Sequence, residues 1–112
     1  MICGSAPITE EVLDYLKVCF CIDINNGYGQ TETCGPASLS WSNDPKGGFH
    51  VGSPYPTCDI KLIDIPEMKY TSLDKDEEGN LMPRGEVCIK GHNVFKGYFN
   101  MPTETKEVID SD

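Results

Sequence analysis

Residues 1–29 read MICGSAPITEEVLDYLKVCFCIDINNGYG and contain three successive patterns. The apolar stretch 1–3 predicts a short strand, and Thr9 is suited to cap a helix over about residues 9–18 because its hydroxyl can accept a hydrogen bond from the first turn. The run Phe20–Ile24 predicts a second short strand. The stretch therefore predicts a strand, helix, strand unit. One face of its helix carries apolar residues at helical spacing, namely Val12, Leu13, Leu16, Cys19 and Phe20.

Small residues follow each predicted strand. Gly4–Pro7 comes after the first strand and Asn25–Gly29 after the second, and both segments are predicted to be loops. Because the carboxyl ends of parallel strands meet at one edge of a sheet, both loops should emerge side by side. Ligands of open α/β sheets usually bind at that edge, so we expect any ligand site there.

The remainder of the chain, beyond Glu32, shows no helical period until its end. Leu73–Gly79 predicts a solvated acidic hairpin loop, since its acids lack the alternate spacing of a calcium-binding loop. Pro102–Ile109 predicts a terminal helix with the proline in its first turn. We expect an α+β fold, in which the strand, helix, strand unit is followed by four to six short, mainly antiparallel strands. Three of these are expected at Ala37–Trp41, Cys58–Ile65 and Glu86–Lys90.

Composition limits the classes of function. The chain has 112 residues, with 18 acidic and 9 basic side chains and a formal net charge of −9. Such a length forms one domain at most. The negative charge repels nucleic acid backbones and Arg84 is the only arginine, so we expect no nucleic-acid partner. No apolar run approaches the ~20 residues of a membrane-spanning helix, so we expect no transmembrane segment.

Six cysteines are the unusual feature of the composition. An even number in a short chain can indicate a disulfide framework or a metal site, but the chain has no C-x-x-C pair. We therefore expect reduced thiols in an intracellular, reducing compartment, with a thiol redox or metal protein as an alternative. We assign these residues to packing or to the surface: Cys3, Cys19, Cys21, Cys34, Cys58, Cys88, His50, His92 and Trp41.

The run GYGQTE (residues 27–32) has the residue types of a nucleotide site. Tyr28 can lie against a purine face, and Thr31 can donate a hydrogen bond to a phosphate oxygen. Glu32 can hold the hard cation that bridges phosphate and protein, and Mg²⁺ would also offset the negative charge of this chain. The same run fits an ordinary glycine turn before a helix start. On these residues alone both interpretations stay open.

Four segments in order resemble the long-chain acyl-CoA synthetases of the adenylate-forming superfamily. CGSAPITEEVLDYL (3–16) resembles the glycine-alanine turn and following helix of that family, and GYGQTE (27–32) its tyrosine-glycine-x-threonine-glutamate motif. HVGSPYPTCDIKLIDIPEMKY (50–70) resembles its glycine-x-proline turn and lysine-leucine strand. GEVCIKGHNVFKGYFNMPTET (85–105) resembles its glycine-glutamate strand and asparagine-valine-phenylalanine-x-glycine-tyrosine loop. The four segments cover almost the whole chain.

The resemblance implies a ligase that activates a fatty acid with ATP to an acyl-adenylate and then transfers the acyl group to CoA, with Mg²⁺. By motif position, Thr31 resembles the donor to the α-phosphate and Glu32 the Mg²⁺ ligand, so these two are the expected catalytic residues. Tyr28 resembles the adenine-stacking residue. The expected nucleotide-binding wall comprises Gly4, Ser5, Ala6, Pro7, Gly27, Gly29 and Gln30. For Ser5 and Gln30 a loop-filling role stays open.

Several parts of that family have no counterpart here. Nothing resembles its phosphate loop with lysine, its ribose-binding threonine-glycine-aspartate motif or its C-terminal catalytic lysine. We therefore expect an internal slice of a longer enzyme that is inactive alone. Residues 1–36 would end the α/β nucleotide-binding subdomain, 37–101 would belong to a distorted β-barrel, and 102–112 would begin a truncated helix.

The expected partners follow from the same resemblance. They are fatty acid, ATP and CoA as substrates of the parent enzyme, together with the remaining segments of that enzyme. Exposed strand edges could also pair two copies as a homodimer. The parent enzyme is expected to lie inside the cell, with a peripheral membrane location left open. The alternative is a small non-enzymatic nucleotide-binding or interaction domain.

Overall fold

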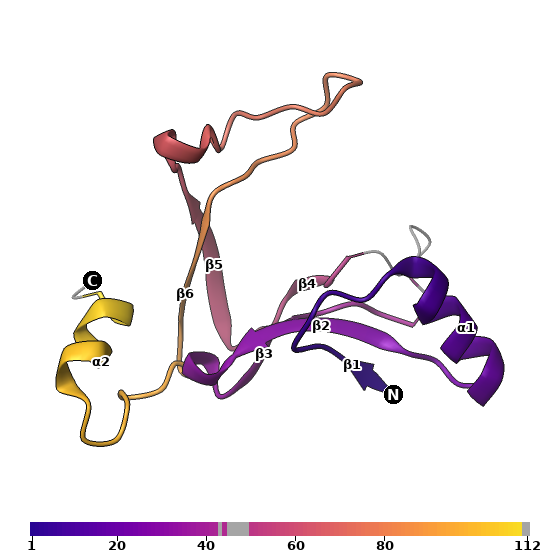
Figure 1. The fold of residues 1–112 in the computed structure, drawn as a ribbon, viewed down its shortest axis with the longest axis horizontal. Helices are drawn as coiled ribbons and strands as arrows, with labels where there is room; N and C mark the ends of the chain where they lie inside the picture. Colours follow the sequence, from indigo (N-terminus) through magenta and orange to yellow (C-terminus); the bar gives the residue numbers. More distant parts are fainter. Residues whose placement is uncertain (43, 45–49, 111–112) are drawn as a thin grey trace.

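The structure is a computed structural model that describes residues 1–42, 44 and 50–110. Residues 111 and 112, the end of the expected terminal segment, lie outside the described residues. Figure 1 labels the α-helices and the strands. In the described chain, two α-helices, six strands and two short 3-10 helices follow one another. In order they are β1 (Ile2–Cys3), α1 (Glu10–Phe20), β2 (Asn25–Gln30), η1 (Thr31–Thr33), β3 (Gly35–Leu39), β4 (Ser53–Pro54), β5 (Cys58–Ile63), η2 (Pro66–Met68), β6 (Glu86–Gly91) and α2 (Pro102–Val108).

The strand, helix, strand unit at the start of the chain is confirmed. β1 pairs with β2 in parallel, with Ile2 opposite Asn25, and α1 connects the two strands. The hydroxyl of Thr9 accepts a hydrogen bond from the backbone N–H of Val12 at 3.4 Å, so Thr9 caps the helix as expected. Leu13 is the one buried residue of α1, at 1% exposure.

The predicted boundary between the helix and the second strand is wrong. The run Phe20–Ile24 is not a strand, because α1 continues to Phe20 and ends at Cys21, whose φ of 50° is left-handed. The strand begins instead at Asn25, where the predicted loop was placed, and its first N–H donates to the carbonyl of Met1 at 2.8 Å. Only one apolar residue of the predicted strand, Ile24, is buried.

Glycines make the strand at Asn25–Gln30 possible. A Cβ on Gly29 would lie 2.2 Å from the carbonyl oxygen of Gly35 on β3, and a Cβ on Gly4 would lie 2.9 Å from the carbonyl oxygen of Gly27. Strand backbones therefore approach more closely here than a side chain would permit. Such close approach is a role of glycine within strands, and the sequence pattern alone indicated a turn.

The strands form two sheets. The first has the order β1-β2-β3-β4, with β2, β3 and β4 antiparallel and a bulge between Tyr28 and Gly29. The second is the antiparallel ribbon β5-β6, which runs from Cys58 opposite Gly91 to Ile63 opposite Glu86. Figure 1 shows this ribbon standing away from the first sheet. The α+β class is confirmed, whereas the described strands close no barrel and that detail stays a prediction.

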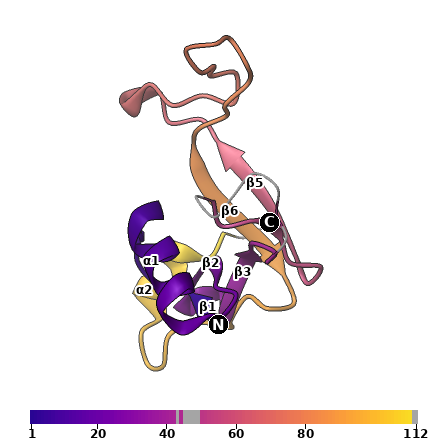
Figure 2. The same cartoon turned by 90° about the vertical axis from the view of Figure 1, so that its right-hand side faces the viewer.

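The acidic hairpin and the terminal helix lie where the sequence predicts them. The hairpin between η2 and β6 extends beyond the ribbon in both views (Figures 1 and 2), and Lys75 pairs with Leu81 across it. Its carboxylates bind the hairpin's own backbone: Asp76 accepts from the N–H groups of Glu78 and Asn80. α2 begins at Pro102, as expected. Within the described residues, neither helix is both long enough and apolar enough to cross a bilayer.

The core is small. The buried apolar side chains of the described residues are Leu13, Ile24, Ala37 and Cys58. Three polar residues are buried as well: Thr33 on η1, Ser38 on β3, and Ser40 just after the end of β3. Most of the buried side chains therefore lie around β2, η1 and β3, and β2 and η1 carry the GYGQTE run. The expected boundary between residues 36 and 37 falls within β3, and the division into subdomains stays a prediction.

Candidate functional site

Two adjoining pockets lie along β2. One has a volume of about 410 Å³ and is lined by the loop after β1, by β2 and by His50 and Val51. The other has a volume of about 610 Å³ and is lined by β1, β2, η1 and the start of β3. Both volumes lie in the range of sites for small molecules, and Ser5 and residues 27–29 line both pockets.

The structure brings together all the site residues that the sequence predicts. The loop Gly4–Pro7 and the run 27–32 are separated by α1 in the sequence, yet they meet because β1 and β2 are parallel neighbours. The expected proximity of the two segments is therefore confirmed, although residues 25–29 form a strand and not a loop, and a ligand at this edge stays a prediction. The residues gathered there are Gly4, Ser5, Ala6, Pro7, Gly27, Tyr28, Gly29, Gln30, Thr31 and Glu32. Their individual roles stay predictions.

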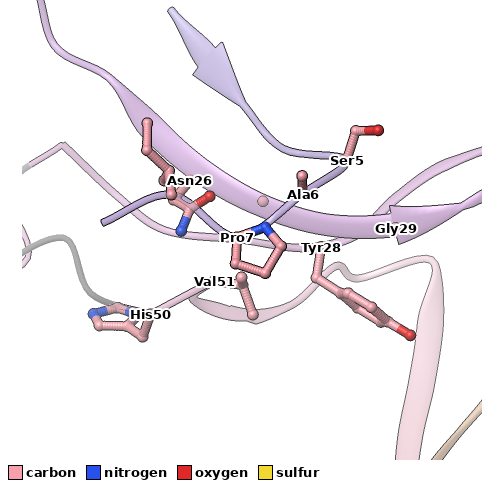
Figure 3. Close-up of a pocket in the computed structure, with 10 residues that line it drawn as sticks. Ser5, Ala6, Pro7, Asn26, Tyr28, Gly29, His50 and Val51 are labelled. Carbon is pink, nitrogen blue, oxygen red and sulfur yellow. The ribbon is translucent and has the colours of Figure 1, made fainter. Parts of the chain in front are cut away.

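Tyr28 projects from β2 into the first pocket. In Figure 3 its ring and the side chains of Pro7 and Val51 lie on one side of β2, and the hydroxyl of Ser5 points away from them. Tyr28 is half-buried, and many of its neighbours in the first pocket are small or apolar. A planar aromatic side chain in this setting can stack on a flat ligand ring.

Ser5 has a strained backbone. Its φ of 76° is left-handed, a conformation that costs a residue with a Cβ of order 1 kcal/mol or more. The strain lies directly before Ala6 and Pro7, at the point where the chain leaves β1 and lines both pockets. Strained residues concentrate at ligand sites, so this outlier marks the loop as a candidate contact.

Thr31 and Glu32 lie on η1, at the end of β2. Thr31 is exposed, and its hydroxyl has no protein partner within the described residues. Glu32 is half-buried, its carboxylate oxygen Oε1 accepts a hydrogen bond from the hydroxyl of Tyr98, and its backbone carbonyl accepts from the N–H of Phe95 at 2.8 Å. The turn therefore presents one free hydroxyl and one carboxylate held by a distant loop.

Thr33 is a structural residue of the site that the sequence analysis missed. It is 2% exposed, and its hydroxyl oxygen accepts from the N–H of Gln30 at 3.0 Å. The same oxygen lies 2.6 Å from the carbonyl of Gly35 and 2.9 Å from that of Gln30, so the hydroxyl can donate to either. Gln30 and Thr33 reverse the usual order of a capping box, in which the serine or threonine comes first, so the sequence pattern did not indicate this cap.

His50 also lies at the site, although it was assigned to packing or the surface. It lines the first pocket, and its Nδ1 accepts from the N–H of Gly52 at 3.0 Å. Nε2 therefore carries the proton of the neutral ring and lies 3.1 Å from a carboxylate oxygen of Asp44. The sequence offered no signal for this placement, because His50 reaches the pocket through pairing of distant strands.

The donor set at η1 suits a hard cation only in part. Glu32 supplies a carboxylate and Thr31 a hydroxyl, and such oxygen ligands are the kind that Mg²⁺ prefers. Among the described residues, no group of three or more histidine, cysteine, aspartate or glutamate side chains could hold a metal ion alone. A cation here would need phosphate oxygens and water as its other ligands, which is the usual arrangement for Mg²⁺ bound with a nucleotide.

The amino-acid sequence of the chain is similar to those of AMP-binding enzymes. The family model of AMP-binding enzymes matches residues 1–99. The chain is 49% identical over 109 residues to fatty acyl-CoA synthetase A of Dictyostelium discoideum and 46% identical over 112 residues to the peroxisomal long chain acyl-CoA synthetase 6 of Arabidopsis thaliana. These alignments cover 97% and 100% of this chain and 15% of each relative.

A solved structure is similar as well. The A-PCP didomain of a carboxylic acid reductase from Segniliparus rugosus, in complex with AMP, matches with a TM-score of 0.73 and 34% identity over 99% of this chain and 13% of its own. The similarity to long-chain acyl-CoA synthetases predicted from four motifs is thus confirmed. The chain spans about 15% of the length of the curated relatives it matches.

Proposed function

Because the chain belongs to the family of AMP-binding enzymes, we propose that it forms the nucleotide-binding edge of a long-chain fatty acid–CoA ligase. One observation carries the proposal: the loop Gly4–Pro7, Tyr28 and the pair Thr31 and Glu32 converge on two adjoining pockets. The names of the relatives, fatty acyl-CoA synthetase A among them, support the choice of a fatty acid and CoA as substrates.

The proposed reaction has two steps. A carboxylate oxygen of the fatty acid attacks the α-phosphorus of ATP, so that an oxygen–phosphorus bond forms, the bond from the α-phosphorus to the bridging oxygen breaks, and pyrophosphate leaves. The thiolate sulfur of CoA then attacks the acyl carbon, a thioester forms, and AMP leaves with the electron pair of the broken carbon–oxygen bond. Both steps depend on positioning and on charge stabilisation at phosphorus.

We assign each residue one task in the first step. Tyr28 stacks on adenine in the first pocket, and the loop Gly4–Pro7 forms the wall beside it. The hydroxyl of Thr31 donates to an oxygen of the α-phosphate, where negative charge develops during the attack. The glycines at 27 and 29 let β2 lie close against β3 and line both pockets, so they shape the wall beside the reacting groups. Gln30 completes the wall of the second pocket.

Glu32 fits Mg²⁺ in this assignment. Its carboxylate would hold the ion, while phosphate oxygens and water would supply the remaining ligands. When bound, Mg²⁺ supplies positive charge that neutralises the phosphate oxygens. This chain carries a net charge of −9, so an anionic nucleotide needs such a cation or basic groups from elsewhere in the protein.

We further propose that a longer protein completes the site. The chain has no counterpart of the family's phosphate loop or catalytic lysine, and the absent segments would also close the expected barrel around the β5-β6 ribbon. The binding site for CoA would likewise need those segments. The long protein would work inside the cell, a location that the peroxisomal name of the Arabidopsis relative supports. A homodimer formed by pairing of strand edges is a further proposal, and the molecular mass of the full-length protein in solution would test it.

Exchange of labelled pyrophosphate into ATP, dependent on fatty acid, tests the proposed first step. In the full-length protein, Thr31→Ala should lower the rate about 10²-fold to 10³-fold, since it removes a hydrogen-bond donor to the developing charge. Glu32→Gln should lower it as well and shift the Mg²⁺ dependence. Thr103→Ala is the control, because that hydroxyl is exposed on α2. Wild-type rates in both site variants would refute the assignment, and AMP binding without exchange in the wild type would favour a non-enzymatic domain.

A further inference from the structure

We propose that Tyr98 is a positioning residue for Glu32: it holds one carboxylate oxygen and leaves the other to bind the cation. The inference rests on the proposed function, because it concerns how Glu32 is set up for Mg²⁺. Tyr98 lies 66 residues further along the chain, in the loop between β6 and α2, and lines neither pocket. It would therefore act through Glu32 and not on the substrate itself.

The first observation is the contact between the two side chains. The hydroxyl of Tyr98 donates a hydrogen bond to Oε1 of Glu32, and both residues are half-buried. Within the described residues, the second carboxylate oxygen, Oε2, accepts no hydrogen bond, while Glu32 lines the second pocket. A hydrogen bond to a charged group is stronger than one between neutral groups, so this contact restricts the carboxylate.

The second observation is that the same loop also holds the backbone of η1. The N–H of Phe95 donates to the carbonyl of Glu32 at 2.8 Å, and the side-chain amide of Asn93 donates to the carbonyl of Thr33 at 3.3 Å. Residues 93–98 thus bind both the backbone of η1 and the side-chain carboxylate of Glu32. The position of Glu32 depends on this loop as well as on β2.

The third observation is that Tyr98 is itself fixed. Its ring packs edge-on against Phe95, with the ring centres 4.8 Å apart, and its N–H donates to the hydroxyl oxygen of Thr105 at 2.9 Å. That hydroxyl donates in turn to the carbonyl of Met101 at 2.7 Å. Gly97 permits this packing, because a Cβ there would lie 2.6 Å from a side-chain carbon of Thr105. Tyr98 is therefore oriented by α2 before any ligand binds.

These contacts lead to a specific expectation for metal binding. Residues that orient a metal ligand typically contribute about 10-fold to 100-fold to metal affinity. Removal of the Tyr98 hydroxyl should leave Glu32 present but less restricted. The loss should therefore appear in the Mg²⁺-dependent part of ATP binding and be small when the metal is absent.

Calorimetric titration of the full-length protein with ATP, in excess Mg²⁺ and separately in EDTA, measures this quantity. For Tyr98→Phe the gain in ATP affinity that Mg²⁺ confers should fall about 10-fold, with affinity in EDTA unchanged. Tyr15→Phe is the matched control, because it removes a hydroxyl from a side chain that is 67% exposed on α1. Adding Tyr98→Phe to Glu32→Gln should cause no further loss if Tyr98 acts only through Glu32.

The outcomes separate the two hypotheses. If Glu32→Gln reduces the Mg²⁺ gain and Tyr98→Phe does not, the positioning role is wrong and the proposed function stands. If Glu32→Gln has no effect, the metal role of Glu32 fails and the positioning role fails with it. If Tyr98→Phe lowered the affinity for ATP equally in Mg²⁺ and in EDTA, the positioning role would also be wrong. Should Tyr98→Phe not fold, Thr105→Val loosens the same tyrosine without altering its hydroxyl and should give a smaller loss of the same kind.

Discussion

At the scale of single residues, Thr33 fixes the turn that carries Thr31 and Glu32. Its hydroxyl oxygen accepts a hydrogen bond from the N–H of Gln30, and the hydroxyl can donate to the carbonyl of Gly35. These two backbone groups lie on either side of η1. Removal of the hydroxyl leaves the N–H of Gln30, whose hydrogen bond is partly buried, without this partner, and an unpaired donor costs more than the hydrogen bond itself contributed. Thr33 is thus expected to stabilise the site without touching a ligand.

We predict that Thr33→Val weakens the turn by about 1–3 kcal/mol. The shape of the side chain is kept and only the polar atom is lost, so the effect should be local. Hydrogen exchange of the peptide that contains residues 28–36, in the full-length protein, measures it as faster exchange. Thr103→Val, at an exposed position on α2, should leave that peptide unchanged. Equal exchange in Thr33→Val and wild type would contradict the role of the hydroxyl.

Whether a site residue could be predicted depends on how far it lies, along the sequence, from the other residues of the site. Tyr28, Thr31 and Glu32 stand together in one run, whose residue types left a nucleotide site and an ordinary glycine turn open; the resemblance to acyl-CoA synthetases favoured the site, and the three residues line one pocket. Tyr98 and His50 reach it only through the pairing of distant strands and loops, and no local pattern records such contacts. Long-range contacts are therefore the part of the site that sequence reasoning missed.

At the scale of elements, the hairpin between η2 and β6 is held by Asp74. Its carboxylate accepts from the hydroxyl of Thr71 at 2.7 Å, from the Thr71 N–H at 3.1 Å and from Nε of Arg84 at 2.8 Å. The Thr71 hydroxyl first, then the Thr71 N–H and Arg84, hold the pKa of Asp74 below its ordinary value of 3.8. Arg84 also lies over the ring of Tyr70, at 4.8 Å.

We predict that acid opens this hairpin. Because the pKa of Asp74 is lower in the folded chain than in the unfolded chain, its stabilising effect is complete above pH 3.8 and is lost as the pH falls through the lower folded value. Asp74→Asn should mimic this loss at neutral pH and speed tryptic cleavage after Arg84 in the full-length protein. Glu77→Gln removes a charge from the same hairpin and should not. Equal cleavage in all three proteins would contradict the prediction.

Elements were predicted well where one pattern decided them and poorly where two competed. β5, β6, α2 and the acidic hairpin lie where alternation, a leading proline and clustered acids placed them. The strand predicted at 20–24 is wrong because Phe20 still belongs to α1, and residues 21–24 form the turn and link that follow its left-handed end at Cys21. The loop predicted at residues 25–29 is wrong because glycine is favoured both in turns and where two strand backbones lie close together.

At the scale of the whole molecule, the described chain is open. Its radius of gyration is 16.3 Å, whereas a compact domain of this length has about 13 Å. Large apolar side chains are exposed on every part of it, among them Phe20, Trp41, Leu62, Leu81 and Phe99. So much exposed apolar surface is unusual for a protein that works alone, and it supports the proposal that further segments cover it.

We predict that the native protein is several times larger than the 12.4 kDa of these 112 residues, and that the isolated chain supports neither half-reaction. The 15% coverage of the curated relatives is the reason. Intact mass of the protein, located in its source by peptides from residues 86–101, tests the first part, and pyrophosphate exchange by the purified chain tests the second. A native mass near 12.4 kDa, or exchange by the isolated chain, would overturn this view.

The central claim is that adenine lies against Tyr28 at the edge formed by β1 and β2. Photolabelling of the full-length protein with 8-azido-ATP, followed by mapping of the labelled peptides, tests that claim most directly. We predict that label competed away by ATP falls within residues 4–7 or 27–32, the segments that line the two pockets. Competable label found only outside residues 1–36 would contradict the account.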